Sequence, residues 1–165
     1  MENESGEMKS CRETAFLEIV DPDECGIGHL VVTTLTNDYM PLVRYRIGDL
    51  VQRLEQPYGT NYLVHGRSQD ALVRRDGRRV TTWEVDQCFA GIGGVAHYSL
   101  RQSADGSCRL EYVPDSAGPA AAELENTIRQ LQDLLQTPEP IPTEAVKILP
   151  PTTAGKFRLT AQSKG

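Results

Sequence analysis

The sequence has no long apolar run. Its longest apolar runs are about as short as residues 30–32 (LVV), whereas a helix that crosses a membrane needs roughly 20 consecutive, predominantly apolar residues. The first five residues, MENES, are acidic and polar, which is the reverse of a secretory signal. We therefore expect a cytoplasmic protein that does not associate with membranes.

Positive charge and clustered cysteines are also scarce. The chain has 17 basic and 23 acidic side chains and a net charge of -6, so it offers no overall cationic field to a nucleic acid. Its cysteines, Cys11, Cys25, Cys88 and Cys108, lie far apart and form no Cys-x-x-Cys motif. This spacing argues against a zinc site and against a disulfide scaffold. We expect reduced thiols, no metal site and no nucleic-acid partner.

The composition that remains is that of a globular chain. With 165 residues, 39% of them hydrophobic and 24% charged, the protein can bury a core. Over residues 13–65, short β-prone runs alternate with turn signals such as Asp21-Pro22-Asp23, and no helical period is sustained. This pattern predicts a small, barrel-like β subdomain. Its expected strands are Ala15–Val20, His29–Leu35, Leu42–Ile47, Asp49–Leu54 and Tyr62–His65.

Near Gly66 the pattern changes and becomes mixed. An Asp-Gly step at Asp76-Gly77 lies between two β-prone arms and predicts a hairpin. A short helix capped by Thr82, strands over 95–102 and 107–113, a helix over 119–136 and a last strand over 145–149 are expected to follow. The predicted fold class is α+β, with a β-rich subdomain followed by a domain whose short sheet is flanked by helices. The expected division is a flexible N-terminus over 1–12, the β-rich subdomain over 13–65, a hinge over 66–70 and the second domain over 71–165.

Asp49 is the first candidate for a ligand-binding side chain. It follows Gly48 at the end of an expected strand, and its ionised carboxylate can accept two hydrogen bonds from a vicinal diol such as a ribose. The alternative is an Asx-type turn that Asp49 caps, and on this motif alone the turn is favoured.

Two cationic side chains are the other candidates. Arg67 lies at the boundary between the two expected domains, where it could reach an anionic ligand; the alternative is a solvated linker. Lys156 follows Gly155 in the stretch PPTTAGK, whose small residues would let a ligand approach the ammonium group. The alternative there is a C-terminal tail with an ordinary surface lysine. The stretch is not a Walker-type phosphate loop, because the earlier glycine and the following helix are missing.

Read in order, three further stretches carry a family resemblance. Residues 16–22 (FLEIVDP), 28–35 (GHLVVTTL) and 40–50 (MPLVRYRIGDL) resemble the C-terminal portion of the adenylate-forming ligases, and most of all the phenylacetate–CoA ligase branch. This superfamily includes acyl-CoA synthetases, luciferases and the adenylation domains of peptide synthetases. The resemblance extends from about residue 13 to about residue 160.

The resemblance implies roles for single residues. Asp49 matches the aspartate that binds the ribose hydroxyls of ATP or acyl-AMP, and Arg67 matches an arginine at the domain junction that contacts the nucleotide. Lys156 matches the lysine that joins the substrate carboxylate and the α-phosphate. Gly77 matches the glycine of a hairpin that lines the pantetheine tunnel during thioester formation. In the family the small domain is a lid that swivels between these two half-reactions.

The sequence also departs from the family pattern. The usual hinge residue falls on Gln69, with Asp70 beside it, and Ile47 stands where a threonine is usual. Asp76 is an extra residue in the hairpin, and Thr82 replaces a proline. The sequence lacks the family's glycine- and threonine-rich phosphate loop, and it lacks the residues of the acyl pocket as well.

We therefore expect this chain to be the C-terminal segment of a phenylacetate–CoA-ligase-like enzyme. It could be a split subunit, a shortened gene product or an excised piece. Its cofactors would be ATP or AMP, as Mg-ATP in the complete enzyme, and coenzyme A or a carrier phosphopantetheine. Its partner would be the missing N-terminal part, and the chain alone would be inactive. Exposed apolar surface would favour self-association of the chain. The alternative function is a non-catalytic interaction module that binds a carrier protein or a partner enzyme.

Overall fold

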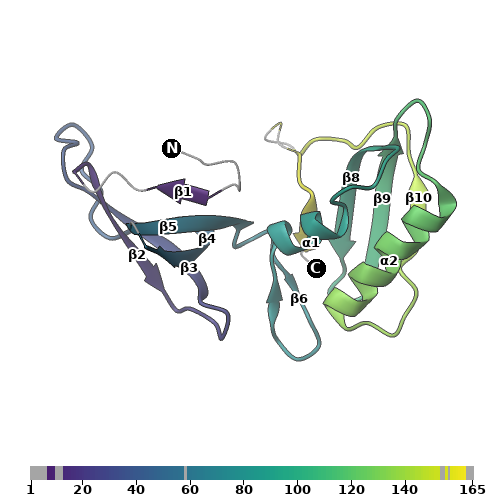
Figure 1. The fold of residues 1–165 in the computed structure, drawn as a ribbon, viewed down its shortest axis with the longest axis horizontal. Coiled ribbons are helices and arrows are strands. Elements are labelled where there is room, and N and C mark those ends of the chain that lie inside the picture. The colour runs from purple at the N-terminus through teal and green to yellow at the C-terminus, as the bar shows by residue number, and fades with distance from the viewer. Residues whose placement is uncertain (1–6, 10–12, 58, 153–154, 156, 163–165) are drawn as a thin grey trace. The chain divides into compact units, whose positions relative to one another are not determined.

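A computed structural model describes residues 7–9, 13–57, 59–152, 155 and 157–162. The chain forms two compact units, Met1–Ser68 and Gln69–Gly165 (Figure 1). The boundary lies inside the segment 66–70 that the sequence marks as a hinge. Among the residues that the structure describes, no helix has both the length and the apolar character needed to cross a membrane.

The first unit is an antiparallel sheet with the strand order β1-β5-β4-β3-β2. β-Branched and aromatic residues in the strands, with Pro, Gly and Asp between them, account for this architecture. Within the described residues the sheet has β1 and β2 as its edges, so its strands do not close into a ring. The strands are β1 (Glu7–Lys9), β2 (Ala15–Val20), β3 (Ile27–Thr34), β4 (Tyr45–Gln56) and β5 (Gly59–Arg67).

Three features of this sheet differ from what the sequence predicts. The expected strands 42–47 and 49–54 are one strand, β4, because Gly48 adopts a φ of 93° and the β4–β5 register shifts after Leu50 without ending the pairing. β4 begins only at Tyr45, since Arg44 has a left-handed backbone with a φ of 45°. The N-terminal segment expected to be flexible contains β1, which pairs with β5 from Asn61 to Leu63.

The second unit combines a mixed sheet, a hairpin and two helices. The sheet order is β10-β9-β8-β11, in which β8 and β9 are antiparallel while β10 and β11 run parallel to their neighbours. With the β-rich first unit, this arrangement confirms the α+β fold class. The elements are β6 (Leu72–Val73), β7 (Arg79–Val80), α1 (Thr82–Cys88), β8 (Val95–Gln102), β9 (Cys108–Pro114), α2 (Ala121–Leu135), β10 (Thr143–Ala145) and β11 (Thr160–Gln162).

The core of this unit lies between the helices and one face of the sheet. In Figure 1, α1 and α2 lie over β8 and β9, and Phe89 after α1 stacks on Tyr98 of β8 with ring centroids 3.7 Å apart. Leu131 and Leu135 of α2 are buried, as the apolar stripe of that helix predicts. The fully buried side chains of this cluster are Leu72, Val80, Val85, Leu100, Leu110 and Leu131.

The ends of two elements differ from the sequence prediction. Thr81, not Thr82, caps α1, and its side chain forms a capping box with Glu84. The last strand was expected over residues 145–149, but β10 ends at Ala145. Strand β11 lies in the expected polar tail, where the buried Thr160 hydrogen-bonds to Thr82 with 2.7 Å between the hydroxyl oxygens. A three-residue strand that forms only by pairing with β8 leaves no periodicity in the sequence.

Candidate functional site

Two of the predicted site residues lie directly opposite each other in the first unit. Asp49 of β4 pairs in register with Arg67 of β5, and the Arg67 Nε lies 3.1 Å from the Asp49 Oδ1. The Asp49 side chain is 23% exposed and the Arg67 side chain 52% exposed. Asp49 lies within a strand, whereas the alternative interpretation placed it at a turn. The sheet therefore presents a carboxylate and a guanidinium together at one partly exposed position.

The backbone around this pair holds the guanidinium in place. Arg67 Nη1 donates to the carbonyl oxygen of Ile47 at 2.8 Å, and the Ser68 amide donates to the Gly48 carbonyl at 2.8 Å. Gly48 is suited to its place because its φ of 93° is unfavourable for other residues. Within the described part of the chain, the Asp49 Oδ2 accepts no hydrogen bond. The pair thus keeps an acceptor and further N–H donors available to a bound ligand.

The predicted hinge residues begin the second unit. Gln69 is exposed and lies in the turn at 68–70. The Asp70 side chain is only 15% exposed, and its Oδ1 lies 3.3 Å from the Arg158 Nε without hydrogen-bond alignment. Asp70 is therefore tied by charge to the segment that precedes β11.

Gly77 lies at the tip of the β6–β7 hairpin, as the Asp-Gly step predicts. The loop is a tight turn in which the Gly77 amide donates to the Arg74 carbonyl at 3.0 Å, and Gly77 has a φ of 85°. Asp76 supports the turn because its carboxylate accepts a hydrogen bond from the Arg78 amide, and this bond together with Arg74 keeps the pKa of Asp76 below its usual value. Three hairpin arginines are ion-paired, namely Arg74 with Asp76, Arg75 with Glu139 and Arg78 with Glu84.

Lys156 lies outside the described residues, and the structure therefore does not place it. Its surroundings are partly described: the Gly155 amide donates to the Thr152 carbonyl at 2.8 Å, and Gly155 has a φ of 72°. The stretch before the lysine thus contains a tight turn that requires a residue with glycine's conformational freedom.

The described cysteines are free thiols. Burial, with a smaller contribution from Glu84, raises the pKa of Cys88. Burial, with Asp105 nearby, raises the pKa of Cys108 to about 11. These two thiols remain protonated at neutral pH and are therefore poor nucleophiles. Cys11 lies outside the described residues.

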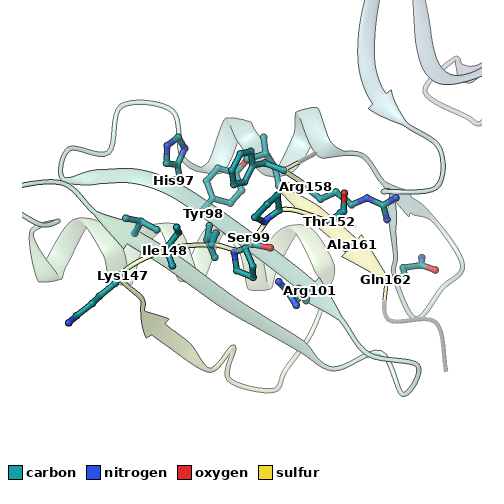
Figure 2. A pocket seen from close by; sticks show the side chains of 16 residues that line it. His97, Tyr98, Ser99, Arg101, Lys147, Ile148, Thr152, Arg158, Ala161 and Gln162 are labelled. Atoms are coloured by element: carbon teal, nitrogen blue, oxygen red, sulfur yellow. The ribbon is translucent and has the colours of Figure 1, made fainter. Parts of the chain in front are cut away.

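A cavity in the second unit was not predicted from the sequence. It has a volume of about 710 Å³, and none of the predicted site residues that the structure describes lines it. Polar side chains at alternate positions of β8, His97, Ser99 and Arg101, form part of its lining (Figure 2). That alternation was the available signal, because a strand buried on both faces would carry apolar residues at these positions.

Comparison with known proteins finds a relative that matches part of this sequence. The phenylacetate-coenzyme A ligase of Thermus thermophilus is 36% identical over 102 residues, which cover 53% of this chain and 23% of that ligase. The chain therefore spans less than a quarter of the curated relative's length. No protein-family profile matches the sequence.

Solved structures share the fold over nearly the whole chain. A 2-hydroxyisobutyryl-CoA ligase, solved in the postadenylation state with the adenylate R3-HIB-AMP, has a TM-score of 0.60 at 19% identity, over 91% of this chain and 35% of the ligase. The acetoacetyl-CoA synthetase of Streptomyces lividans has a TM-score of 0.62 at 19% identity, over 88% of this chain and 25% of the synthetase. The chain thus has the fold of about a third or less of these enzymes.

Proposed function

Because the chain has the sequence features and the fold of the C-terminal portion of the adenylate-forming ligases, we propose that it supplies part of the nucleotide site and the lid of such an enzyme. In the first half-reaction a carboxylate attacks the α-phosphorus of Mg-ATP, giving acyl-AMP and pyrophosphate. In the second, a thiol of coenzyme A or of a carrier phosphopantetheine displaces AMP and gives a thioester. Asp49 and Arg67, paired across two strands with 3.1 Å between Nε and Oδ1, are the observation that carries this proposal.

In the proposed site, Asp49 accepts hydrogen bonds from the ribose hydroxyls. The Asp49 Oδ2 accepts no hydrogen bond from the described residues, so it can receive a hydroxyl donor without losing an existing bond. Arg67 orients this carboxylate, and its half-exposed guanidinium can contact the nucleotide directly. The pair therefore binds and orients the nucleotide rather than taking part in bond making.

The second unit acts as the lid in this proposal. Lys156 would offset the negative charge that develops when the carboxylate attacks the α-phosphorus. Gly77, at a hairpin tip where a side chain would contact nothing within 4 Å, would line the path of the pantetheine thiol. Gln69 and Asp70, at the boundary of the two units, would provide the swivel between the two states.

The proposed reaction needs a part that these 165 residues do not contain. No glycine- and threonine-rich phosphate loop occurs in the sequence, so the β- and γ-phosphates of ATP would be held by a larger part, on this polypeptide or on another. Exposed apolar side chains in the first unit fit such a partner, since Tyr39, Met40 and Val43 are each more than half exposed.

The test is an assay of the chain with and without that larger part. The chain, tagged and expressed in its native host, is used to capture polypeptides that carry a phosphate loop. Pyrophosphate release is then measured with Mg-ATP and an aryl acid such as phenylacetate. We expect release from the mixture but not from either component. Turnover by the purified 165-residue chain alone would contradict the proposal.

The alternative function, a non-catalytic interaction module, is distinguished by Lys156→Ala. In the proposed enzyme the variant still joins the larger part, but adenylation falls by orders of magnitude because the charge at the α-phosphate is lost. A module that only binds a carrier protein or a partner enzyme would keep its full effect with alanine at this position.

A further inference from the structure

The cavity of the second unit lies on the face of the sheet away from the helices. Tyr98 and Leu100 of β8 belong to the core with α1 and α2, so the alternate residues His97, Ser99 and Arg101 project from the opposite face. Tyr98 also lines the cavity. Residues 147–152, which follow β10, cross the opposite face and line the cavity (Figure 2). Its volume of about 710 Å³ is in the range of small-molecule binding sites. We call it the β8 groove.

The walls of the β8 groove are largely apolar and open to solvent. Ile148 and Phe157 line it and are 73% and 71% exposed. Pro150 and Pro151 continue this surface, and Ala161 of β11 leaves room between the walls. Large apolar side chains that a fold leaves open around a cavity are typical of a surface that another molecule covers.

The polar groups of the groove favour an anion. No aspartate or glutamate is among the described residues that line it. Arg101 is 48% exposed, and its nearest acid, Glu111 on β9, lies at 3.8 Å, beyond hydrogen-bond distance. Arg158 also lines the groove, but it lies closer to its acid than Arg101 does, with 3.3 Å between its Nε and the Asp70 Oδ1. Lys147 lines the groove too, but in Figure 2 its side chain points away from the other labelled side chains. Arg101 is therefore the cationic group best placed to bind a ligand there.

Ser99 supplies a second, independent observation. Its side chain lines the groove two residues from Arg101 on the same face of β8, and the residue is only 5% exposed. No hydrogen bond of its hydroxyl is found within the described part of the chain. This hydroxyl can therefore donate a hydrogen bond to an acceptor atom of a ligand in the groove.

We propose that the β8 groove binds a small amphipathic anion, with a flat apolar body against Ile148 and Phe157 and one anionic group at Arg101 and Ser99. The site lies wholly in the second unit and uses neither Asp49 nor Arg67. It is therefore independent of the proposed ligase function.

The test uses two dyes of similar shape on the 165-residue chain. The anionic 8-anilino-1-naphthalenesulfonate and the neutral N-phenyl-1-naphthylamine are titrated separately, and fluorescence reports binding. Arg101→Met removes the charge but keeps an apolar chain. Arg109→Met is the matched control, because Arg109 is ion-paired with Glu144 on the same sheet and does not line the groove. Ala161→Phe fills the groove, and thermal unfolding of each variant verifies that it folds.

We expect saturable binding of the anionic dye, weakened roughly tenfold by Arg101→Met and unchanged by Arg109→Met. Ser99→Val should also weaken binding of the anionic dye. Binding of the neutral dye should change only in the Ala161→Phe variant. Equal binding of the anionic dye by the chain and by a folded Ala161→Phe variant would overturn the proposal, because the dye would then occupy another apolar surface. Loss of dye binding as the chain dimerises would also overturn it, since a second copy would then be the occupant.

Discussion

At the scale of single residues, the Asp49–Arg67 pair contributes little to stability. With Arg67 half exposed, solvent screens the attraction, and exposed ion pairs contribute about 0–1 kcal/mol. We therefore predict that Asp49→Asn and Arg67→Met each change the free energy of unfolding by less than about 1 kcal/mol in urea titrations. A loss of several kcal/mol would mean that the pair has a structural role and would weaken the case for a nucleotide site.

Gly94 is a residue where the backbone leaves no room for a side chain. Its φ is 81°, and a Cβ there would lie 2.1 Å from the Gly118 carbonyl oxygen. The neighbouring Gly93 would place a Cβ in open space without a positive φ. We predict that Gly94→Ala lowers the free energy of unfolding by about 2–4 kcal/mol, whereas Gly93→Ala changes it by less than about 1 kcal/mol. Equal effects in urea unfolding would refute the close contact.

The buried Cys108 thiol makes the free energy of unfolding depend on pH in the alkaline range. Its pKa is raised to about 11, whereas the thiol of an unfolded chain ionises near 9.0. Between these values the unfolded state binds fewer protons than the folded state, so stability falls as pH rises, by up to about 1.4 kcal/mol per pH unit. We predict that Cys108→Ala makes the loss of stability between pH 9 and pH 11 less steep, measured as the unfolding midpoint in urea. An identical slope in both proteins would contradict this assignment.

At the scale of elements, α1 depends on its cap. Thr81 is 2% exposed, and its hydroxyl accepts the Glu84 amide while the Glu84 carboxylate accepts the Thr81 amide. We predict that Thr81→Ala lowers the free energy of unfolding by about 1–2 kcal/mol, because the first turn loses a hydrogen-bond acceptor. Thr81→Ser keeps the hydroxyl and should recover most of this loss in thermal unfolding. If serine were as destabilising as alanine, the missing methyl contacts rather than the cap would be responsible.

The elements with local signals could be predicted from the sequence. Strand β2 and the hairpin around Gly77 agree with the pattern, and α2 lies within a residue or two of the expected helix. Strands β1 and β11, each three residues long, form by pairing with β5 and β8, so no local signal marks them. The residue pattern made Asp49 and Arg67 candidates one at a time, and the family resemblance gave them their roles. Their pairing depends on the β4–β5 register, which the sequence does not reveal. The β8 groove needs the chain after β10 to cross the sheet, which is a tertiary feature.

At the scale of the whole molecule, exposed apolar side chains favour association. Phe16, Tyr39, Met40 and Val43 of the first unit are all more than half exposed. Burying them removes apolar surface from water, at about 25 cal/mol per Å². We predict that the 165-residue chain self-associates as its concentration rises, measured by sedimentation velocity, and that Met40→Lys shifts the equilibrium toward the monomer. A strict monomer at every concentration would contradict this prediction.

The central claim is that Asp49 and Arg67 bind the nucleotide in an enzyme assembled with a larger part. The most direct measurement is the affinity of that assembly for a fluorescent ATP analogue, compared between Arg67→Met and Arg53→Met. Both arginines are half exposed and ion-paired on the same sheet, Arg53 with Glu55. The account predicts a loss of roughly tenfold or more for Arg67→Met and for Asp49→Ala, and no change for Arg53→Met. Unchanged affinity in the first two variants would contradict it.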